Sequence, residues 1–109
     1  MKPEISVTIP VLNEAGNLTP LHNELTEVLT RLGKPFELIY INDGSTDGSG
    51  AELAKLSGAT VIEMNRRFGK ATAFMAGFSH ASGSVIVTID GDGQNDPNDI
   101  PKLLKEMES

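Results

Sequence analysis

Apolar and polar residues alternate along the chain in blocks that predict strands and helices in turn. Runs rich in β-branched and other apolar residues predict four strands, at 5–11, 36–41, 60–64 and 84–89. Apolar residues at helical spacing predict four helices between and after them, at 18–32, 49–56, 71–81 and 97–107. The connections are short, so consecutive strands are expected to join through right-handed crossovers into a mainly parallel sheet of an α/β fold.

Two of these elements allow more detailed predictions. The strand at 84–89 is almost continuously apolar and β-branched, which is typical of a strand buried on both faces. The helix at 71–81 is rich in small residues, and its large apolar residues Phe74, Met75 and Phe78 are expected on the packing side.

Composition and charge narrow the function. A length of 109 residues with 39% hydrophobic residues fits one packed domain. The 15 acidic and 9 basic side chains give a net charge of −6, which argues against a nucleic-acid partner. The chain has no cysteine, no signal-peptide pattern and no apolar run near the roughly 18 residues of a membrane span. A cytoplasmic location is therefore expected.

Polar residues gather directly after three of the predicted strands, at 10–14, 42–48 and 90–94. The carboxyl ends of parallel strands meet along one edge of a sheet, where open α/β folds bind their ligands. Asp90 and Asp92 place two carboxylates on one short turn, and the neighbouring glycines allow both to converge on one ion. Gln94 adds a carbonyl oxygen. Such oxygen ligands suit Mg²⁺ or Mn²⁺, and this cation would let an acidic protein bind a diphosphate.

Each of these polar groups also has a structural interpretation. Asp90 and Asp92 are equally typical of a solvated turn. Asp43 suits the N–H donors of a nucleobase edge, but also a turn or a helix cap. Asn13 and Glu14 fit either the opening cap of the first helix or a contact with base and ribose.

The basic residues include one cluster, Arg66, Arg67 and Lys70, where the third helix is predicted to begin. Cations beside a helix N-terminus suit a sugar diphosphate, and solvated surface side chains are the equally weighted alternative for each of them.

Other common catalytic patterns do not occur in the sequence. The glycine spacing matches neither a phosphate loop nor a dinucleotide-binding fingerprint, and no Ser/His/Asp nucleophilic arrangement is visible. His22 and His80 fall within predicted helices, so we expect structural or surface roles for both. Asp47 favours a helix cap over a site role.

Four short motifs occur in order: Ile-Pro-Val-Leu-Asn-Glu at 9–14, Ile-Asn-Asp-Gly-Ser-Thr-Asp-Gly at 41–48, Asn-Arg-Arg-Phe-Gly-Lys at 65–70 and Asp-Gly-Asp-Gly-Gln-Asn-Asp-Pro at 90–97. Together they resemble family 2 glycosyltransferases, and most closely the branch of dolichol-phosphate mannosyltransferases and bacterial polyprenyl-phosphate glycosyltransferases. The resemblance implies a Rossmann-like three-layer α/β/α fold with a mainly parallel sheet. It further implies that residues 1–109 are the N-terminal, nucleotide-binding half of a GT-A catalytic domain.

The resemblance also implies roles for individual residues. The nucleotide-sugar-binding set would be Pro10, Leu12, Asn13, Glu14, Asp43 and Asp90, with Arg67 and Lys70 as secondary members. The metal ligands would be Asp90, Asp92 and Gln94, with the two aspartates as the catalytic residues. The chain departs from the family pattern at Leu12, where tyrosine is frequent, at Asn42, where aspartate is usual, and at Gly91 and Gly93, where alanine and leucine are common.

The reaction implied by the resemblance transfers a sugar, with inversion, from GDP-mannose or a UDP-hexose. A polyprenyl or dolichyl phosphate is the expected acceptor, and because its phosphate is largely ionised at neutral pH it needs no general base. The full-length enzyme is expected at the cytoplasmic face of a membrane, and a homo-oligomer is compatible with it. We expect this chain to bind the donor but to lack the acceptor-binding part.

Two other functions stay open from the sequence. A noncatalytic nucleotide-binding or regulatory module would bind its ligand without metal, or not at all. A sugar nucleotidyltransferase would also use a parallel sheet and an acidic metal site. Such enzymes usually carry a Gly-rich basic loop after the first strand, and residues 10–14 contain neither glycine nor a basic residue.

Overall fold

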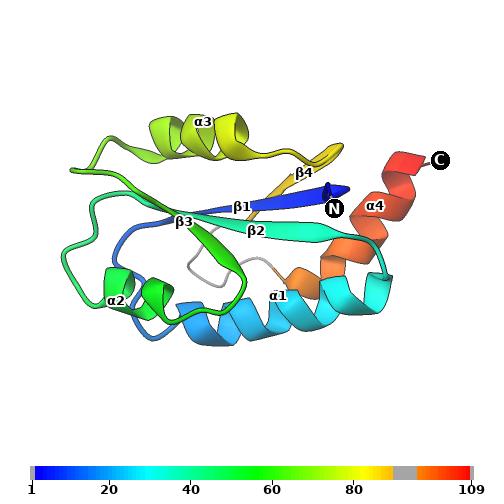
Figure 1. Cartoon of the computed structure of the whole chain (residues 1–109), viewed down its shortest axis with the longest axis horizontal. Helices are drawn as coiled ribbons and strands as arrows, with labels where there is room; N and C mark the ends of the chain where they lie inside the picture. The colour runs from blue at the N-terminus through cyan, green and yellow to red at the C-terminus, as the bar shows by residue number, and fades with distance from the viewer. Residues whose placement is uncertain (1, 90–95, 109) are drawn as a thin grey trace.

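The computed structural model describes residues 2–89 and 96–108 and shows a four-stranded sheet between layers of helices (Figure 1). The strands are β1 (Ile5–Val11), β2 (Phe36–Asn42), β3 (Ala59–Glu63) and β4 (Val85–Thr88). The helices are α1 (Leu18–Leu32), α2 (Ser49–Ala54), α3 (Lys70–His80), the 3-10 helix η1 (Pro97–Asp99) and α4 (Ile100–Glu108). The strand order is β3-β2-β1-β4 and each of these pairs is parallel, which confirms the predicted α/β class.

The register of the two central strands positions the polar segments that follow them. β1 pairs with β2 along its whole length, from Ile5 opposite Phe36 to Val11 opposite Asn42. One further bond, from the Asp43 N–H to the Val11 carbonyl oxygen at 2.8 Å, continues the ladder beyond the strands. The segments after β1 and β2 therefore start side by side at one edge of the sheet, as predicted.

Helix α1 covers one face of the sheet, together with α2, and packs through a stripe of leucines. Leu18, Leu21, Leu25 and Leu29 are buried at helical spacing and join the main hydrophobic core, which also contains the inward side chains of β1. The helix ends at Gly33, whose φ of 74° is the left-handed conformation typical of a C-terminal glycine. Its range and its end are as predicted.

Of the helices that the structure describes, α3 is the one that lies on the opposite face of the sheet (Figure 1). The side of α3 that was predicted to pack is wrong. Met75 is 65% exposed and Phe78 is 44% exposed, while Phe74 is half-buried and stacks on Phe78 with ring centroids 6.4 Å apart. The residues that α3 buries are Ala73 and Gly77.

Helix α3 buries small residues because it lies very close to the sheet. A Cβ atom on Gly77 would lie 2.9 Å from Ile41 Cδ1 and 3.1 Å from Thr8 Cβ, so the sheet leaves no room for a side chain there. Small residues therefore face the sheet, and the large apolar residues of α3 lie at its sides and on its outer face.

The prediction that the last strand is buried on both faces is also wrong. Val85 and Val87 pack against the core on the α1 side, but Ile86 is 41% exposed. In the part of the chain that the structure describes, β4 is an edge strand of the sheet, and α3 lies over β1 and β2. One face of β4 is consequently left partly open.

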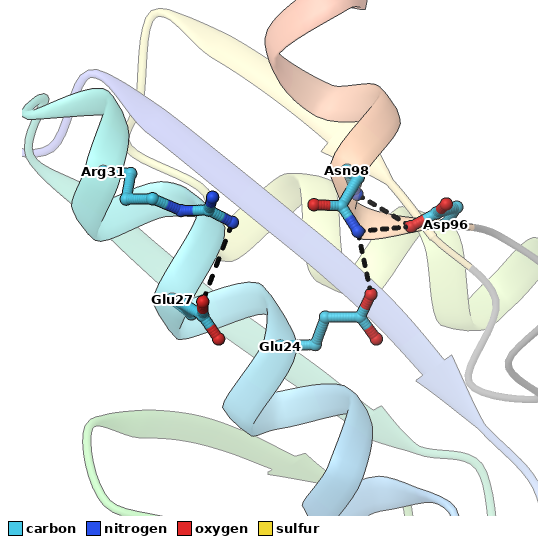
Figure 2. Close-up of polar contacts among 5 residues, drawn as sticks. All are labelled: Glu24, Glu27, Arg31, Asp96 and Asn98. Carbon is cyan, nitrogen blue, oxygen red and sulfur yellow. Dashed lines mark hydrogen bonds and ion pairs between the residues drawn. The ribbon is translucent and has the colours of Figure 1, made fainter.

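The described chain resumes after β4 at Asp96, and polar contacts fix this residue against α1 (Figure 2). Asp96 is the N-cap of η1, and its Oδ1 accepts a hydrogen bond of 2.9 Å from the Asn98 N–H. Asn98 Nδ2 donates to Asp96 Oδ1 at 3.0 Å and to Glu24 Oε1 at 3.1 Å. One turn further along α1, Arg31 and Glu27 form an exposed ion pair of 3.9 Å.

Candidate functional site

A cavity of about 100 Å³ lies at the edge of the sheet where β1 and β2 end. Three segments line it: Pro10 and Val11 at the end of β1 with Leu12 directly after it, Asp43 after β2, and Arg67 and Lys70 before or at the start of α3. We call it the sheet-edge cavity. The fold thus brings Pro10, Leu12, Asp43, Arg67 and Lys70 of the predicted nucleotide-sugar-binding set around one hollow, whereas Asn13 and Glu14 are not part of its lining.

Asp43 joins two of these segments. Its side chain is only 3% exposed, and its Oδ1 accepts a hydrogen bond of 2.8 Å from the Phe68 N–H. Its Oδ2 accepts a second bond of 3.0 Å from the Gly69 N–H. Asp43 therefore anchors the segment that carries Arg67. Because each carboxylate oxygen has two acceptor positions, these bonds leave capacity for a ligand N–H.

Gly44 lets the loop after β2 touch the same segment. Its φ is +74°, and a Cβ atom there would lie 2.4 Å from Arg67 N and 2.7 Å from the Arg66 carbonyl carbon. Glycine has no Cβ and adopts this backbone conformation readily. The sequence did not predict this contact, since a glycine after a strand is typical of many loops.

The basic cluster lies at the N-terminus of α3. Arg66 and Arg67 are exposed, and the Arg66 guanidinium carbon is 4.8 Å from the centre of the Phe68 ring. Gly69, with a φ of 104°, precedes Lys70, the first residue of the helix. Cationic side chains and the partial positive charge of the helix end both favour an anion at this place.

Asn13 connects the loop after β1 to the loop after β2. It has a positive φ of 55°, which asparagine tolerates better than most residues. Its N–H donates to Ser45 Oγ at 3.0 Å, and its Oδ1 accepts from the Thr46 N–H at 2.8 Å. The Asn13 amide is therefore already engaged beside the sheet-edge cavity.

The structure tests whether Asn13, Glu14 and Asp47 cap the helices that follow them. The N-cap of α1 is Asn17, which removes the cap alternative for Asn13 and Glu14. The Glu14 N–H donates to Ser49 Oγ at 2.9 Å, and its Oε2 accepts from Asn17 Nδ2 at 3.1 Å. The N-cap of α2 is Gly48, not Asp47; Asp47 Oδ1 accepts from the Ser49 N–H at 2.9 Å directly before that helix.

The predicted metal ligands Asp90, Asp92 and Gln94 lie outside the described residues. Within residues 2–89 and 96–108, no group of three or more His, Cys, Asp or Glu side chains is arranged to hold a metal ion. The predicted donors are two carboxylates and one carboxamide, all oxygen ligands, and this chemistry fits Mg²⁺ or Mn²⁺. They follow Ile89, which is buried and donates its N–H to the Thr8 carbonyl oxygen at 3.0 Å.

A larger hollow of about 660 Å³ lies between α1 and the turn after α2, and we call it the α1 groove. It is lined by Thr19, His22, Asn23, Thr26, Glu27, Thr30, Arg31, Lys55, Leu56 and Ser57. These residues come from α1 and from residues 55–57, not from the segments that directly follow β1 and β2. The α1 groove is larger than the sheet-edge cavity, but it lacks the polar segments at the strand ends and is therefore not the candidate site.

His22, in the α1 groove, has a structural role, as predicted. Its Nε2 lies 2.8 Å from the Ser57 carbonyl oxygen, which only accepts, so Nε2 carries the proton and donates. Its Nδ1 lies 2.8 Å from the Tyr40 hydroxyl. Burial raises the pKa of Tyr40 well above its ordinary value, so the hydroxyl stays protonated and donates to Nδ1. Both ring nitrogens are thus used within the fold.

Comparison with known proteins gives a family and several similar structures. The family described as Glycosyl transferase family 2 matches residues 6–109. Glucosyl-3-phosphoglycerate synthase from Mycobacterium tuberculosis, solved with Mn²⁺, UDP and glucosyl-3-phosphoglycerate, has a TM-score of 0.78 and 27% identity over 96% of this chain. The mannosyltransferase PcManGT from Pyrobaculum calidifontis, solved with GDP-Man and Mn²⁺, has a TM-score of 0.68 and 28% identity over 91% of this chain.

A third structure supports the fold alone. TarS from S. aureus (residues 1–349) has a TM-score of 0.69 and covers 99% of this chain, but at 20% identity. The chain spans 39% of the synthase, 30% of the mannosyltransferase and 32% of this TarS structure. These similarities confirm that the parallel sheet between two layers of helices is the arrangement found in GT-A glycosyltransferases.

Proposed function

The chain belongs to glycosyl transferase family 2, and from that premise we propose that it binds the nucleotide-sugar donor of a glycosyltransferase. The donor is GDP-mannose or a UDP-hexose. The solved structures of similar sequence support this choice, since the mannosyltransferase was crystallised with GDP-Man and the synthase with UDP.

The sheet-edge cavity is the observation that carries the proposal. Pro10 and Leu12 give it an apolar wall for a base, and Asp43 gives it an acceptor for base N–H groups. Arg67 and Lys70 supply positive charge for a diphosphate. Ligand sites usually measure about 300–1,000 Å³, so this hollow of about 100 Å³ accounts for one part of a nucleotide sugar.

Asp90 and Asp92, with Gln94, would hold the Mg²⁺ or Mn²⁺ ion. When bound, the ion stabilises the negative charge that develops on the departing diphosphate. The presence of Mn²⁺ in both enzyme structures named above supports this assignment. Arg67 and Lys70 would offset the rest of that charge from the side of α3.

The acceptor that we propose is a polyprenyl or dolichyl phosphate. Its phosphate oxygen attacks the anomeric carbon of the donor sugar with inversion and displaces the nucleoside diphosphate. Among the described residues that line the sheet-edge cavity, Asp43 is the one carboxylate, and both its oxygens already accept backbone N–H bonds. An acceptor that is already ionised at neutral pH needs no general base. No helix within residues 2–89 and 96–108 is long and apolar enough to cross a membrane. With a polyprenyl or dolichyl phosphate as acceptor, the full-length enzyme would work at the cytoplasmic face of a membrane.

Calorimetric titration of the chain with GDP and with UDP, each with and without Mn²⁺, tests the donor site. We expect one nucleotide to bind in the presence of Mn²⁺, with binding strongly weakened by Asp92→Ala and retained in the control Asp99→Ala. Binding that needs no metal and is unaffected by Asp92→Ala would instead favour a noncatalytic nucleotide-binding module. Binding of neither nucleotide under any of these conditions would contradict the proposal.

A further inference from the structure

The loop between β1 and α1 is held by side chains from the segment that follows β2. Four consecutive N–H groups each donate to a different one of these side chains: Asn13 to Ser45 Oγ (3.0 Å), Glu14 to Ser49 Oγ (2.9 Å), Ala15 to Asp47 Oδ2 (3.2 Å) and Gly16 to Glu52 Oε1 (2.7 Å). We call the acceptors Ser45, Asp47, Ser49 and Glu52 the loop clasp. Its members come from outside the loop that they hold.

Glu52 makes the largest number of these contacts. Besides the bond from Gly16, its Oε2 accepts hydrogen bonds of 2.7 Å from both the N–H and the hydroxyl of Thr19. Thr19 lies in the first turn of α1, and the local N-cap Asn17 makes no side-chain cap bond. Glu52 in α2 therefore caps α1 from another helix, and its negative charge suits the positive end of the α1 dipole.

Apart from the loop clasp, the loop is held by a bond of 2.8 Å from the Thr46 N–H to Asn13 Oδ1 and by a turn bond of 3.0 Å from the Asn17 N–H to the Glu14 carbonyl oxygen. Asn13, Ala15, Gly16 and Asn17 are all exposed, so the loop contributes few buried apolar contacts of its own. A segment of this kind opens locally at a free energy well below that of global unfolding unless specific bonds hold it. The loop clasp supplies most of the bonds that join this loop to the rest of the fold.

We propose that Glu52 is a positioning residue for nucleotide binding, acting through the loop that it holds. Leu12, which lines the sheet-edge cavity, directly precedes the first clasped N–H, that of Asn13. When the loop opens, the chain directly after Leu12 is no longer held in place, and the cavity wall formed by Pro10–Leu12 loses that support. This inference rests on the proposed function, because it assumes that the nucleotide binds in the sheet-edge cavity.

The chemistry of Glu52 fits this role at neutral pH. Burial raises the pKa of Glu52, but the hydrogen bonds from Thr19 and Gly16 outweigh that effect and hold the pKa below its ordinary value, despite the nearby negative charge of Asp47. The ionised carboxylate has enough acceptor positions for all three donors. A glutamine of the same shape has one oxygen and one NH₂ group, so one of the backbone N–H groups would face another donor.

The test compares Glu52→Gln with Glu27→Gln, a charge-matched control on the exposed side of α1. Nucleotide affinity is measured by calorimetry in Mn²⁺, loop order by amide hydrogen exchange at residues 13–19, and global stability by thermal unfolding. For Glu52→Gln we expect faster exchange at these amides. If the loop is then ordered for only about a tenth of the time, the dissociation constant rises about tenfold. The control should leave both quantities unchanged.

The milder variant Ser45→Ala removes one acceptor next to Leu12 and should shift affinity and exchange in the same direction, by less. Unchanged affinity alongside faster exchange in Glu52→Gln and Ser45→Ala would overturn the positioning role and leave the proposed function intact. Unchanged exchange in both variants would overturn the loop clasp itself. If the unmodified chain binds neither GDP nor UDP, the proposed function fails, and this inference fails with it.

Discussion

Substitution of Asp43 by asparagine tests the anchor between the loop after β2 and the start of α3. The asparagine keeps the size of the side chain but offers one acceptor oxygen where the carboxylate offers two. One of the two bonded N–H groups, at Phe68 or Gly69, would then face an NH₂ group. The site is 3% exposed, so water compensates poorly for the lost bond.

The expected loss of stability follows from these contacts. A hydrogen bond to a charged group contributes about 1.5–3 kcal/mol, so the two bonds at 2.8 and 3.0 Å together contribute about 3–6 kcal/mol. The asparagine retains one neutral bond of about 1 kcal/mol, which leaves a loss of about 2–5 kcal/mol. For a domain of this size each kcal/mol corresponds to a fall of about 4–8 °C in the unfolding temperature.

Urea unfolding followed by circular dichroism measures this loss, and amide exchange locates it at Phe68 and Gly69. Asp99→Asn is the control, because Asp99 is exposed near a helix start and should lose at most about 1 kcal/mol. If Asp43→Asn loses no more than this control, Asp43 does not anchor the segment, and our description of the cavity wall is wrong.

Two further substitutions test other contacts of the fold. Gly44→Ala forces a non-glycine residue into a left-handed conformation, which costs about 1–2 kcal/mol, and adds a Cβ atom in close contact with Arg67 N. Urea unfolding should show a loss of at least this size in the free energy of unfolding. An unchanged free energy would contradict the tight contact. Burial raises the pKa of Glu37, but hydrogen bonds from Ser6 and Ser82 outweigh it and hold the pKa below 4.5. The stability contributed by Glu37 is therefore present above its unfolded pKa and is lost as pH falls through the lower folded pKa. In Glu37→Gln the free energy of unfolding should consequently fall less steeply below about pH 4.5 than in the unmodified chain. Identical pH profiles for the two proteins would refute this.

Local sequence patterns were sufficient to predict most elements of the fold. The leucine spacing of α1 and the glycine after it set the range of that helix, because both act within the segment itself. The meeting of polar segments at one sheet edge followed from their places after parallel strands. Pro10, Leu12, Asp43, Arg67 and Lys70 do line one cavity there.

Features that depend on distant parts of the chain were not predicted. The packing side of α3 was wrong because contact with the sheet selects Ala73 and Gly77 over the larger Phe78, which the helical pattern alone does not indicate. The exposure of Ile86 depends on the place of β4 in the sheet, not on its own residues.

The loop clasp was missed for the same kind of reason. Its bonds join residues 32–36 positions apart, and serine, aspartate and glutamate in such a segment are equally typical of solvated loops. Only the register of β1 and β2 brings the two loops together.

Nuclear magnetic resonance titration of the ¹⁵N-labelled chain with GDP and UDP in Mg²⁺ tests most directly where a nucleotide binds. We predict that the largest amide shift changes occur at Leu12, Asp43, Arg67 and Lys70, around the sheet-edge cavity, and that the α1 groove is unaffected. Changes concentrated in the α1 groove, or none with either nucleotide, would contradict the assignment of the donor site.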